Sequence, residues 1–330
     1  MKQILTESQL KKRLVDYDLK FTDDQFKHLM KLGFYHVFNS FVPKKIRENG
    51  NEKKLSDYLF LYKLDRELSS IIFPMIVELE SFLKQRLNDV LLKEVLGESL
   101  KSPHYNNIVQ YCIREKNNLS AKKLLFKSTN NSNPIVDHYF KNHNDIPIWG
   151  YIELLTLNDF LQFYNFCTIS QDYNPNRDGV KEKFLKAINF TDSSNNIFGF
   201  DGKKLSIYQI FILIKDVRNN IAHNQPVIDN RFIKGDYKVD IISNVLNEIA
   251  PKVINRTIYD STFNFKQSIE TFYLIFILYL YFIGNDFLIK NMINFFDDKI
   301  VSNSYSISSN VLERCLGRNY LYFSNLIRSN

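Results

Sequence analysis

Arg218 and His223 lie five positions apart near the end of an apolar segment, and each side chain suits one kind of chemistry. Histidine in general titrates near neutral pH, so it can take up and release protons during a reaction. Arginine stays charged and can bind a phosphate through its planar fork of N–H donors. The two residues therefore fit the cleavage of RNA without a metal ion, in which the 2′-OH attacks the adjacent phosphorus. That reaction leaves a 2′,3′-cyclic phosphate and a 5′-OH.

The polar residues around this pair fit the same chemistry but also allow a structural interpretation. Asn219 lies one helical turn before His223 and shares its face, where it could hold a ribose or a phosphate. Asn220 and Asn224 are further candidates for RNA binding. In the structural interpretation, Arg218 caps backbone carbonyls and His223 makes one hydrogen bond at a helix end. The Arg-x4-His spacing does not decide between the two, because chance alone offers about 0.6 such matches in this chain.

A buried helix over about residues 205–224 is expected to position these residues. Five apolar side chains recur at spacings of three and four: Ile207, Ile210, Ile214, Val217 and Ile221. Pro226 disfavours helical geometry at the residue before it, so the helix should end there. Residues five apart on a helix point about 140° apart, so Arg218 and His223 of one chain do not easily face one phosphate. A two-fold dimer would bring Arg218 of one chain to His223 of the other, and we therefore expect a homodimer.

The rest of the sequence also predicts helices, and the expected fold class is all-α. Thr22 and Gln25 form a capping box that should begin a helix ending near Gly33. The longest periodic apolar segment runs from Leu55 to Leu96, where Pro74 is expected to kink the helix or split it in two. The chain has only 10 Gly and 8 Pro, few for the turns of an all-β protein. Further helical patterns cover residues 135–141, 147–167, 180–189, 240–256 and 264–294.

The composition predicts a folded protein and suits a polyanionic partner. Apolar residues make up 45% of the chain and aromatic residues 15%, which excludes a disordered chain. The formal charge of +7, from 43 basic and 36 acidic side chains, fits RNA as a partner but does not require it. Lys122 and Lys123, with Lys127 behind them, are either an RNA-facing patch or a solvated helix end.

Cysteine usage and the apolar segments indicate a cytoplasmic protein with no membrane partner. The three cysteines are scattered and odd in number, which favours a reducing compartment. The N-terminal sequence turns charged too early to hold a secretory signal. The apolar run from Thr271 to Ile283 has 13 residues, short of the roughly 20 that span a bilayer, and predicts a buried core helix. The histidines are scattered and no phosphate-binding glycine loop is present, so we expect neither a metal site nor a cofactor.

The segment RNNIAHNQPVIDNR (218–231) resembles a segment of the Abi-like (abortive infection) proteins, which belong to the HEPN ribonuclease superfamily. Three earlier segments are similar to other elements of that family: GFYHVFNSF (33–41), residues 61–87 with Asp65, Arg66 and Glu80, and residues 146–164 with Pro147, Trp149 and Glu153. The chain departs from the family at several positions: Ser69 and Lys84 where arginine is common, Asn158 where glycine is common, and Ile221 and Asn224 where a cysteine and a second histidine are common. His223 is therefore the only histidine in its segment.

The resemblance implies a HEPN-type helical bundle and a metal-independent endoribonuclease. We expect a HEPN-like core over residues 55–270, an N-terminal helical element over 1–54 and a C-terminal helical cap over 271–330. The implied role is that of a toxin-like effector in phage defence, restrained by an antitoxin protein or a non-coding RNA. The alternative is a non-catalytic RNA-binding or adaptor protein that keeps the HEPN fold. Asp65, Arg66, Glu78 and Glu80 are interpreted as a buried charge network in preference to an acid pair.

Overall fold

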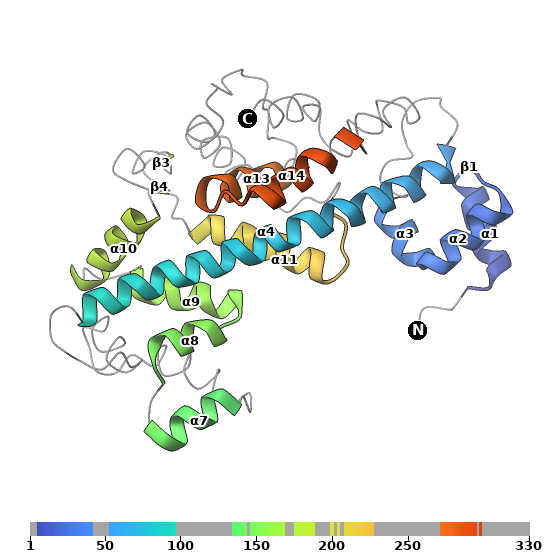
Figure 1. The fold of residues 1–330 in the computed structure, drawn as a ribbon. Coiled ribbons are helices and arrows are strands. Elements are labelled where there is room, and N and C mark those ends of the chain that lie inside the picture. The colour runs from blue at the N-terminus through green and yellow to red at the C-terminus, as the bar shows by residue number, and fades with distance from the viewer. Residues whose placement is uncertain are drawn as a thin grey trace.

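The computed structural model describes residues 5–41, 53–96, 134–143, 146–168, 175–188, 199–200, 203–204, 208–227, 271–295 and 297–298. Within these ranges the chain is helical apart from two pairs of two-residue strands, so the all-α prediction is confirmed. One long helix, α4 (Leu55–Leu96), runs through the molecule, and other helices lie along it (Figure 1). Lys122 and Lys123, and the helix expected over 240–256, lie outside the described residues.

Three short helices form the N-terminal part of the chain: α1 (Glu7–Asp16), α2 (Asp23–Leu32) and α3 (Phe34–Phe41). The second of them begins as predicted, with a capping box between Thr22 and Gln25, and ends at Gly33, whose φ of +96° favours glycine. The first helix was not predicted, although Thr6 and Gln9 form the same capping box at its start. The repeated Thr-x-x-Gln pattern was therefore a usable signal in the sequence.

The N-terminal helices have a small apolar core of their own. Strand β1 (Leu19–Lys20) pairs in parallel with β2 (Lys53–Lys54), which leads directly into α4. Eight buried residues form this core: Leu10, Leu14, Leu19, Phe26, Leu29, Phe34, Val37 and Leu55. Because Leu55 is the first residue of α4, the N-terminal helices pack against the beginning of the long helix.

The long helix α4 continues without a break through Pro74. Of the two effects expected of this proline, a kink or a division into two helices, the division is therefore wrong. A proline inside a helix removes one hydrogen bond and costs about 3 kcal/mol. Its neighbours Ile72, Met75 and Ile76 are fully buried in the main core, and the burial of several such side chains outweighs this cost.

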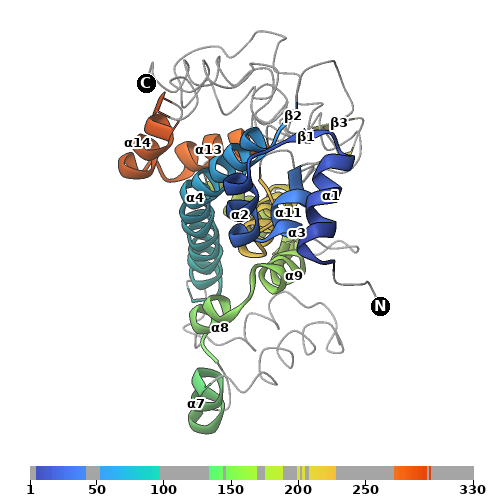
Figure 2. The same cartoon turned by 90° about the vertical axis from the view of Figure 1, so that its right-hand side faces the viewer.

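The main core lies along α4, and nine of its buried residues on that helix were predicted by the apolar periodicity: Leu61, Leu64, Leu68, Ile72, Met75, Ile76, Leu79, Leu83 and Leu87. Val90 and Leu91 are also buried there, and the predicted Ile71 is only partly buried. Six helices contribute residues to this core: α8 (Ile148–Leu154), α9 (Leu157–Thr168), α10 (Pro175–Ala187), α11 (Tyr208–Ala222), α13 (Thr271–Phe282) and α14 (Asp286–Asn294). A further helix, α7 (Pro134–His143), precedes them in the chain. Figures 1 and 2 show α11 and α13 lying alongside α4. The helix that carries Arg218 is thus fixed to the longest element of the fold.

Two predicted helices are each divided in the structure. The stretch expected over 147–167 forms α8 and α9, because the Thr156 side chain accepts the N–H of Asp159 and starts a new helix. The stretch expected over 264–294 contains α13 and α14, separated by Gly284, whose φ is +65°. Asn285 then caps the start of α14 by accepting the N–H of Phe287. In both places the residues that start the second helix are common capping residues.

The most apolar helix, α13, is a core helix as predicted. Its residues 275–279 are buried, and α13 packs against α4. The hydroxyl of Tyr279 donates to Glu78 on α4, and burial together with this carboxylate raises the pKa of Tyr279 well above its ordinary value. Within the described ranges, no helix is both long enough and apolar enough to cross a membrane.

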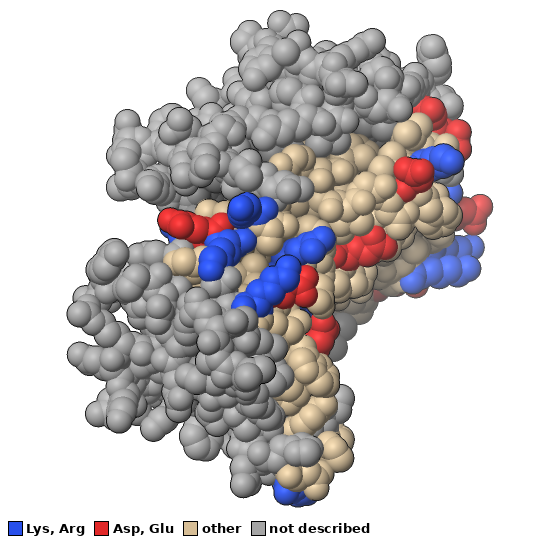
Figure 3. Space-filling model, turned by 60° about the vertical axis from the view of Figure 1, so that its left-hand side comes forward, with Lys and Arg blue, Asp and Glu red and all other residues tan. Residues whose placement is uncertain are grey.

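Charged side chains on the described surface are mixed by sign. Figure 3 shows one face of the molecule, on which several Lys and Arg side chains lie near the middle with Asp and Glu side chains beside them, while most of the described surface is uncharged. Most of the described ion pairs are exposed or partly exposed, among them Lys11 with Asp23, Arg86 with Asp89, and Lys141 with Asp137. Pairs of this kind contribute little to stability.

Candidate active site

Helix α11 buries one face and leaves its final turn accessible. Of the predicted apolar stripe, Ile214 and Val217 are fully buried and Ile221 is partly buried. The side chains of Ile207 and Ile210 lie outside the described residues. His223 is the first residue after the helix and is exposed. The chemistry predicted from the sequence needs this exposure, because the imidazole must reach a substrate.

A fixed turn ends α11 at Ala222. Three backbone hydrogen bonds form it: His223 N–H to Asn219 O at 2.9 Å, Asn224 N–H to Ile221 O at 2.9 Å and Gln225 N–H to Asn220 O at 2.7 Å. The last two make the Schellman arrangement that often closes a helix. Asn224 takes the left-handed conformation with φ +54°, which costs most residues about 1–2 kcal/mol but which asparagine tolerates. His223 therefore occupies the C-cap of a defined turn.

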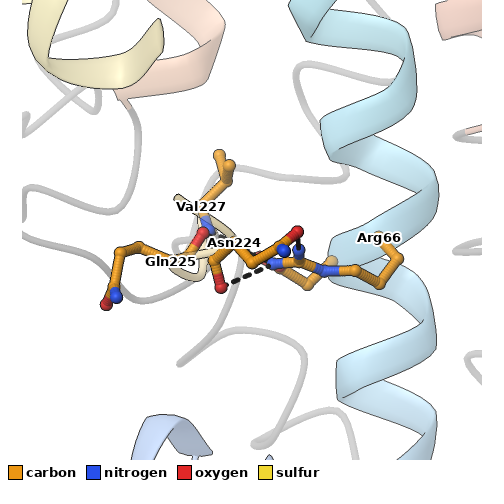
Figure 4. A network of polar contacts seen from close by, with 5 residues as sticks. Arg66, Asn224, Gln225 and Val227 are labelled. Carbon is orange, nitrogen blue, oxygen red and sulfur yellow. Dashed lines mark hydrogen bonds and ion pairs between the residues drawn. The ribbon is translucent and has the colours of Figure 1, made fainter. Parts of the chain in front are cut away.

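Two adjacent residues of α4 bind this turn from outside. The Asp65 carboxylate accepts the N–H of Val227 at 2.6 Å and an N–H of Arg66 at 2.7 Å. The other terminal nitrogen of Arg66 donates to the side-chain oxygen of Asn224 at 2.9 Å, as Figure 4 shows. Arg66 Nη2 also lies 3.4 Å from the carbonyl oxygens of Asn224 and Gln225. The end of α11 is thus tied to a position 158 residues earlier in the chain.

Arg218 is held by a different part of α4. Its Nε lies 3.6 Å from a carboxylate oxygen of Glu80, and the other oxygen of Glu80 lies 2.8 Å from the ammonium of Lys84. Lys84 also donates to the carbonyl of Leu155 at the end of α8. The Glu80 and Lys84 side chains are 12% and 8% exposed, whereas that of Arg218 is 37% exposed. The four residues expected to form one buried charge network have separate partners: Asp65 pairs with Arg66, Glu78 accepts a hydrogen bond from Tyr279, and Glu80 pairs with Lys84 and Arg218. The largely buried carboxylate of Glu80 lies beside Arg218.

Arg218 and the residue that follows His223 contact different parts of α4. Arg66, which contacts the residue after His223, is fourteen positions before Glu80, or about 21 Å along the helix at 1.5 Å per residue. Within the described part of the chain, no hydrogen bond or ion pair joins Arg218 to His223, and His223 has no side-chain partner. That the two residues act from different chains stays a prediction.

The three asparagines of the motif have different surroundings. Asn219 and Asn220 contribute their carbonyl oxygens to the turn, and their side chains are half-buried and make no hydrogen bond within the described residues. The side chain of Asn224 is exposed but contacts Arg66. A role of these residues in RNA binding stays a prediction. Among the described residues, no three His, Cys, Asp or Glu side chains come close enough to hold a metal ion.

Sequence reasoning did not assign Arg66 to this site. Asp65 and Arg66 were noticed because the segment 61–87 resembles an element of the family, but the sequence did not show what these two residues contact. Asn224 gave a second signal, because an asparagine just before Gln-Pro at a helix end is a common left-handed residue. Together these signals indicated a fixed turn after His223, whereas the contact itself needed the structure.

Stability measurements can test the ion pairs of Glu80. Replacing Glu80 with glutamine is expected to lower the free energy of unfolding by about 3 kcal/mol, because the buried ammonium of Lys84 loses its counter-charge. Arg218→Ala is expected to cost less than about 1 kcal/mol, since that side chain is partly exposed. Urea denaturation followed by circular dichroism measures both. If both variants lost the same free energy of unfolding, the buried ammonium of Lys84 would not depend on Glu80 as its counter-charge.

The chain is similar to a known family over most of this fold. A model of the Abi-like protein family matches residues 27–229, which is more than half of the chain. The matched range begins in α2 and ends two residues after Val227, so it includes the turn and both of the residues first singled out. The chain belongs to the Abi-like protein family, and this membership supports a role in abortive infection. No curated protein and no solved structure matches the chain.

Proposed function

We propose that the chain is a metal-independent endoribonuclease of the HEPN type that acts in abortive infection, with Arg218 and His223 as its catalytic residues. The observation that carries this proposal is the exposed imidazole of His223 at the C-cap of a turn that two residues of α4 hold in place. A catalytic acid or base needs both access to the substrate and a fixed position. Membership of the Abi-like family supports the same assignment.

In the proposed reaction, His223 moves protons and Arg218 binds the phosphate. His223 takes the proton from the attacking 2′-OH and then gives it to the 5′-oxygen as the bond from phosphorus to that oxygen breaks. The guanidinium of Arg218 stabilises the charge on the non-bridging oxygens as the phosphorus becomes five-coordinate. Since Asn224 stands where a second histidine is common in the family, each chain supplies one imidazole from this segment.

The proposed active unit is a homodimer. Glu80 holds Arg218 along α4 in the direction away from the turn that carries His223. A two-fold axis beside the exposed end of α11 would place His223 opposite Arg218 of the partner subunit. Each of the two resulting clefts would then contain one imidazole and one guanidinium. Restraint of this ribonuclease would need a partner that covers the two clefts. That partner would be an antitoxin protein or a non-coding RNA.

One experiment tests the activity and the mechanism together. The purified protein is incubated with total cellular RNA in EDTA, and the ends of the products are analysed. We expect cleavage in EDTA with 2′,3′-cyclic phosphate and 5′-OH ends. Products that end in 3′-OH, or cleavage that returns only with Mg²⁺, would contradict the mechanism. Binding of RNA without any cleavage would favour the non-catalytic RNA-binding alternative.

Binding of RNA is expected to weaken steeply with salt. Each phosphate contact with single-stranded RNA contributes about −0.7 to the slope of log affinity against log salt concentration. If about four phosphates are contacted, the slope is about −3, and a threefold rise in salt lowers affinity about 30-fold. Fluorescence anisotropy with a labelled RNA measures this slope. A flat response would favour a protein ligand and thus the adaptor alternative.

A further inference from the structure

The position of His223 depends on a turn that the helix does not fix by itself. Arg218 lies inside α11, where the hydrogen bonds of the helix fix its backbone and its Nε lies 3.6 Å from Glu80. His223 is the first residue after α11, and the next residue, Asn224, has a positive φ. A residue in this conformation persists where the surrounding structure holds it. The position of the imidazole therefore depends on what contacts the turn.

Arg66 supplies that contact. Its guanidinium donates to the Asn224 side chain at 2.9 Å and lies near the carbonyl oxygens of Asn224 and Gln225. The last carbonyl groups of a helix carry partial negative charge, so a cation beside them is favourable. One planar guanidinium can reach several acceptors at once, which the single ammonium of a lysine cannot do in the same way.

Arg66 is itself held from two other directions. The Asp65 carboxylate, which is fully buried, accepts one of its N–H groups at 2.7 Å. The ring of Tyr62, one turn earlier on α4, lies 5.5 Å from the guanidinium carbon, close enough for a cation–π contact. His36 of α3 packs edge-on against that ring at 5.8 Å. With its neighbours fixed in this way, the guanidinium of Arg66 is an anchor for the turn.

We propose that Arg66 is a positioning residue that fixes the imidazole of His223 against RNA by binding Asn224. The inference rests on the proposed ribonuclease function and adds to it a residue outside the Arg-x4-His motif. Arg66 acts on the proton-transfer step, because it holds the turn, and it leaves the phosphate-binding residue Arg218 untouched. Loss of Arg66 should therefore lower kcat and leave KM unchanged.

Two variants remove the contact from opposite sides. Arg66→Lys keeps the charge beside Asp65 but cannot span Asp65 and Asn224 as the guanidinium does. Asn224→Gly keeps the positive φ but removes the side-chain acceptor. Each variant is expected to lower kcat by about 10- to 100-fold, because small misplacements of a catalytic group have effects of this size. The KM of each variant is expected to change less than about twofold. The double variant is expected to fall no further than the single ones, since both remove the same bond.

Arg86→Ala is the matched control. Arg86 lies on the same helix, stacks on Phe82 at 5.0 Å and pairs with Asp89, far from the turn. It is expected to leave kcat and KM unchanged. A rise in KM with unchanged kcat for Arg66→Lys would show that Arg66 binds RNA directly, which overturns the proposal. Additive losses in the double variant would overturn it as well. If Arg66→Lys does not fold, Asn224→Gly alone decides.

Hydrogen exchange gives a measurement that does not depend on ribonuclease activity. In Arg66→Lys, the backbone amides of residues 223–225 and 227 should exchange about tenfold faster, while peptides from α9 exchange as in the unmodified protein. If the unmodified protein cleaves no RNA, the proposed function fails, and exchange then decides alone whether Arg66 fixes the turn. Unchanged exchange at these amides would overturn the proposal whatever the activity. Faster exchange with unchanged kcat would show that the turn does not govern catalysis.

Discussion

Replacing His223 with alanine is expected to lower RNA cleavage by about 100- to 10,000-fold, because a positioned acid or base contributes about this much to a reaction rate. Arg218→Ala is expected to lower it by about 100- to 1,000-fold, the usual effect of removing one donor that stabilises a transition state. Both rates are measured in EDTA on a defined single-stranded RNA. Toxicity on expression in a host should disappear with the activity.

The fold of both variants should remain intact. His223 is exposed and has no side-chain partner within the described residues, and Arg218 is partly exposed beside Glu80. Surface substitutions of this kind change stability little. The matched control is His28→Ala, which removes an exposed histidine from α2 and should keep full activity. Activity close to that of the unmodified protein in His223→Ala would rule out the proposed role of the imidazole.

The sequence predicted those parts of the fold that depend on neighbouring residues. The capping box at Thr22 and the stop at Gly33 are local signals, and the structure confirms both. The apolar spacing along α4 identified its buried face, because a helix places residues three and four apart on one side. The division of the helix that Pro74 suggested does not occur, since its local cost is opposed by burial that comes from distant helices.

The contacts that organise the candidate site could not be predicted from one sequence. Arg66 and Asn224 are 158 residues apart, and nothing in their local sequence pairs them. The contact of Glu80 with Arg218 is also long-range and depends on how α11 lies along α4. The sequence suggested Asn224 only as a candidate for RNA binding. In the structure Asn224 also takes the left-handed conformation that ends α11, which asparagine tolerates better than most residues.

Mixing two inactive variants is expected to restore part of the activity if each cleft takes Arg218 and His223 from different chains. In a heterodimer of Arg218→Ala and His223→Ala, the first chain supplies His223 and the second supplies Arg218. One of the two clefts is then complete. With equal amounts and free exchange, half of the dimers are heterodimers, so the mixture should reach about one quarter of the activity of the unmodified protein. A site within one chain would regain nothing, because no chain in the mixture carries both residues.

The measurement needs proof that subunits have exchanged. Two distinguishable affinity tags, purified in sequence, isolate the heterodimer, and its activity should be about half that of a tagged dimer of the unmodified chain. Mixing Arg218→Ala with itself in two tagged forms is the control and should stay inactive. The reason to expect recovery is the helical geometry of residues 218–223, in which side chains five positions apart point about 140° apart. An isolated heterodimer without activity would contradict the one-pair cleft and leave either a site within one chain or a cleft that needs all four side chains.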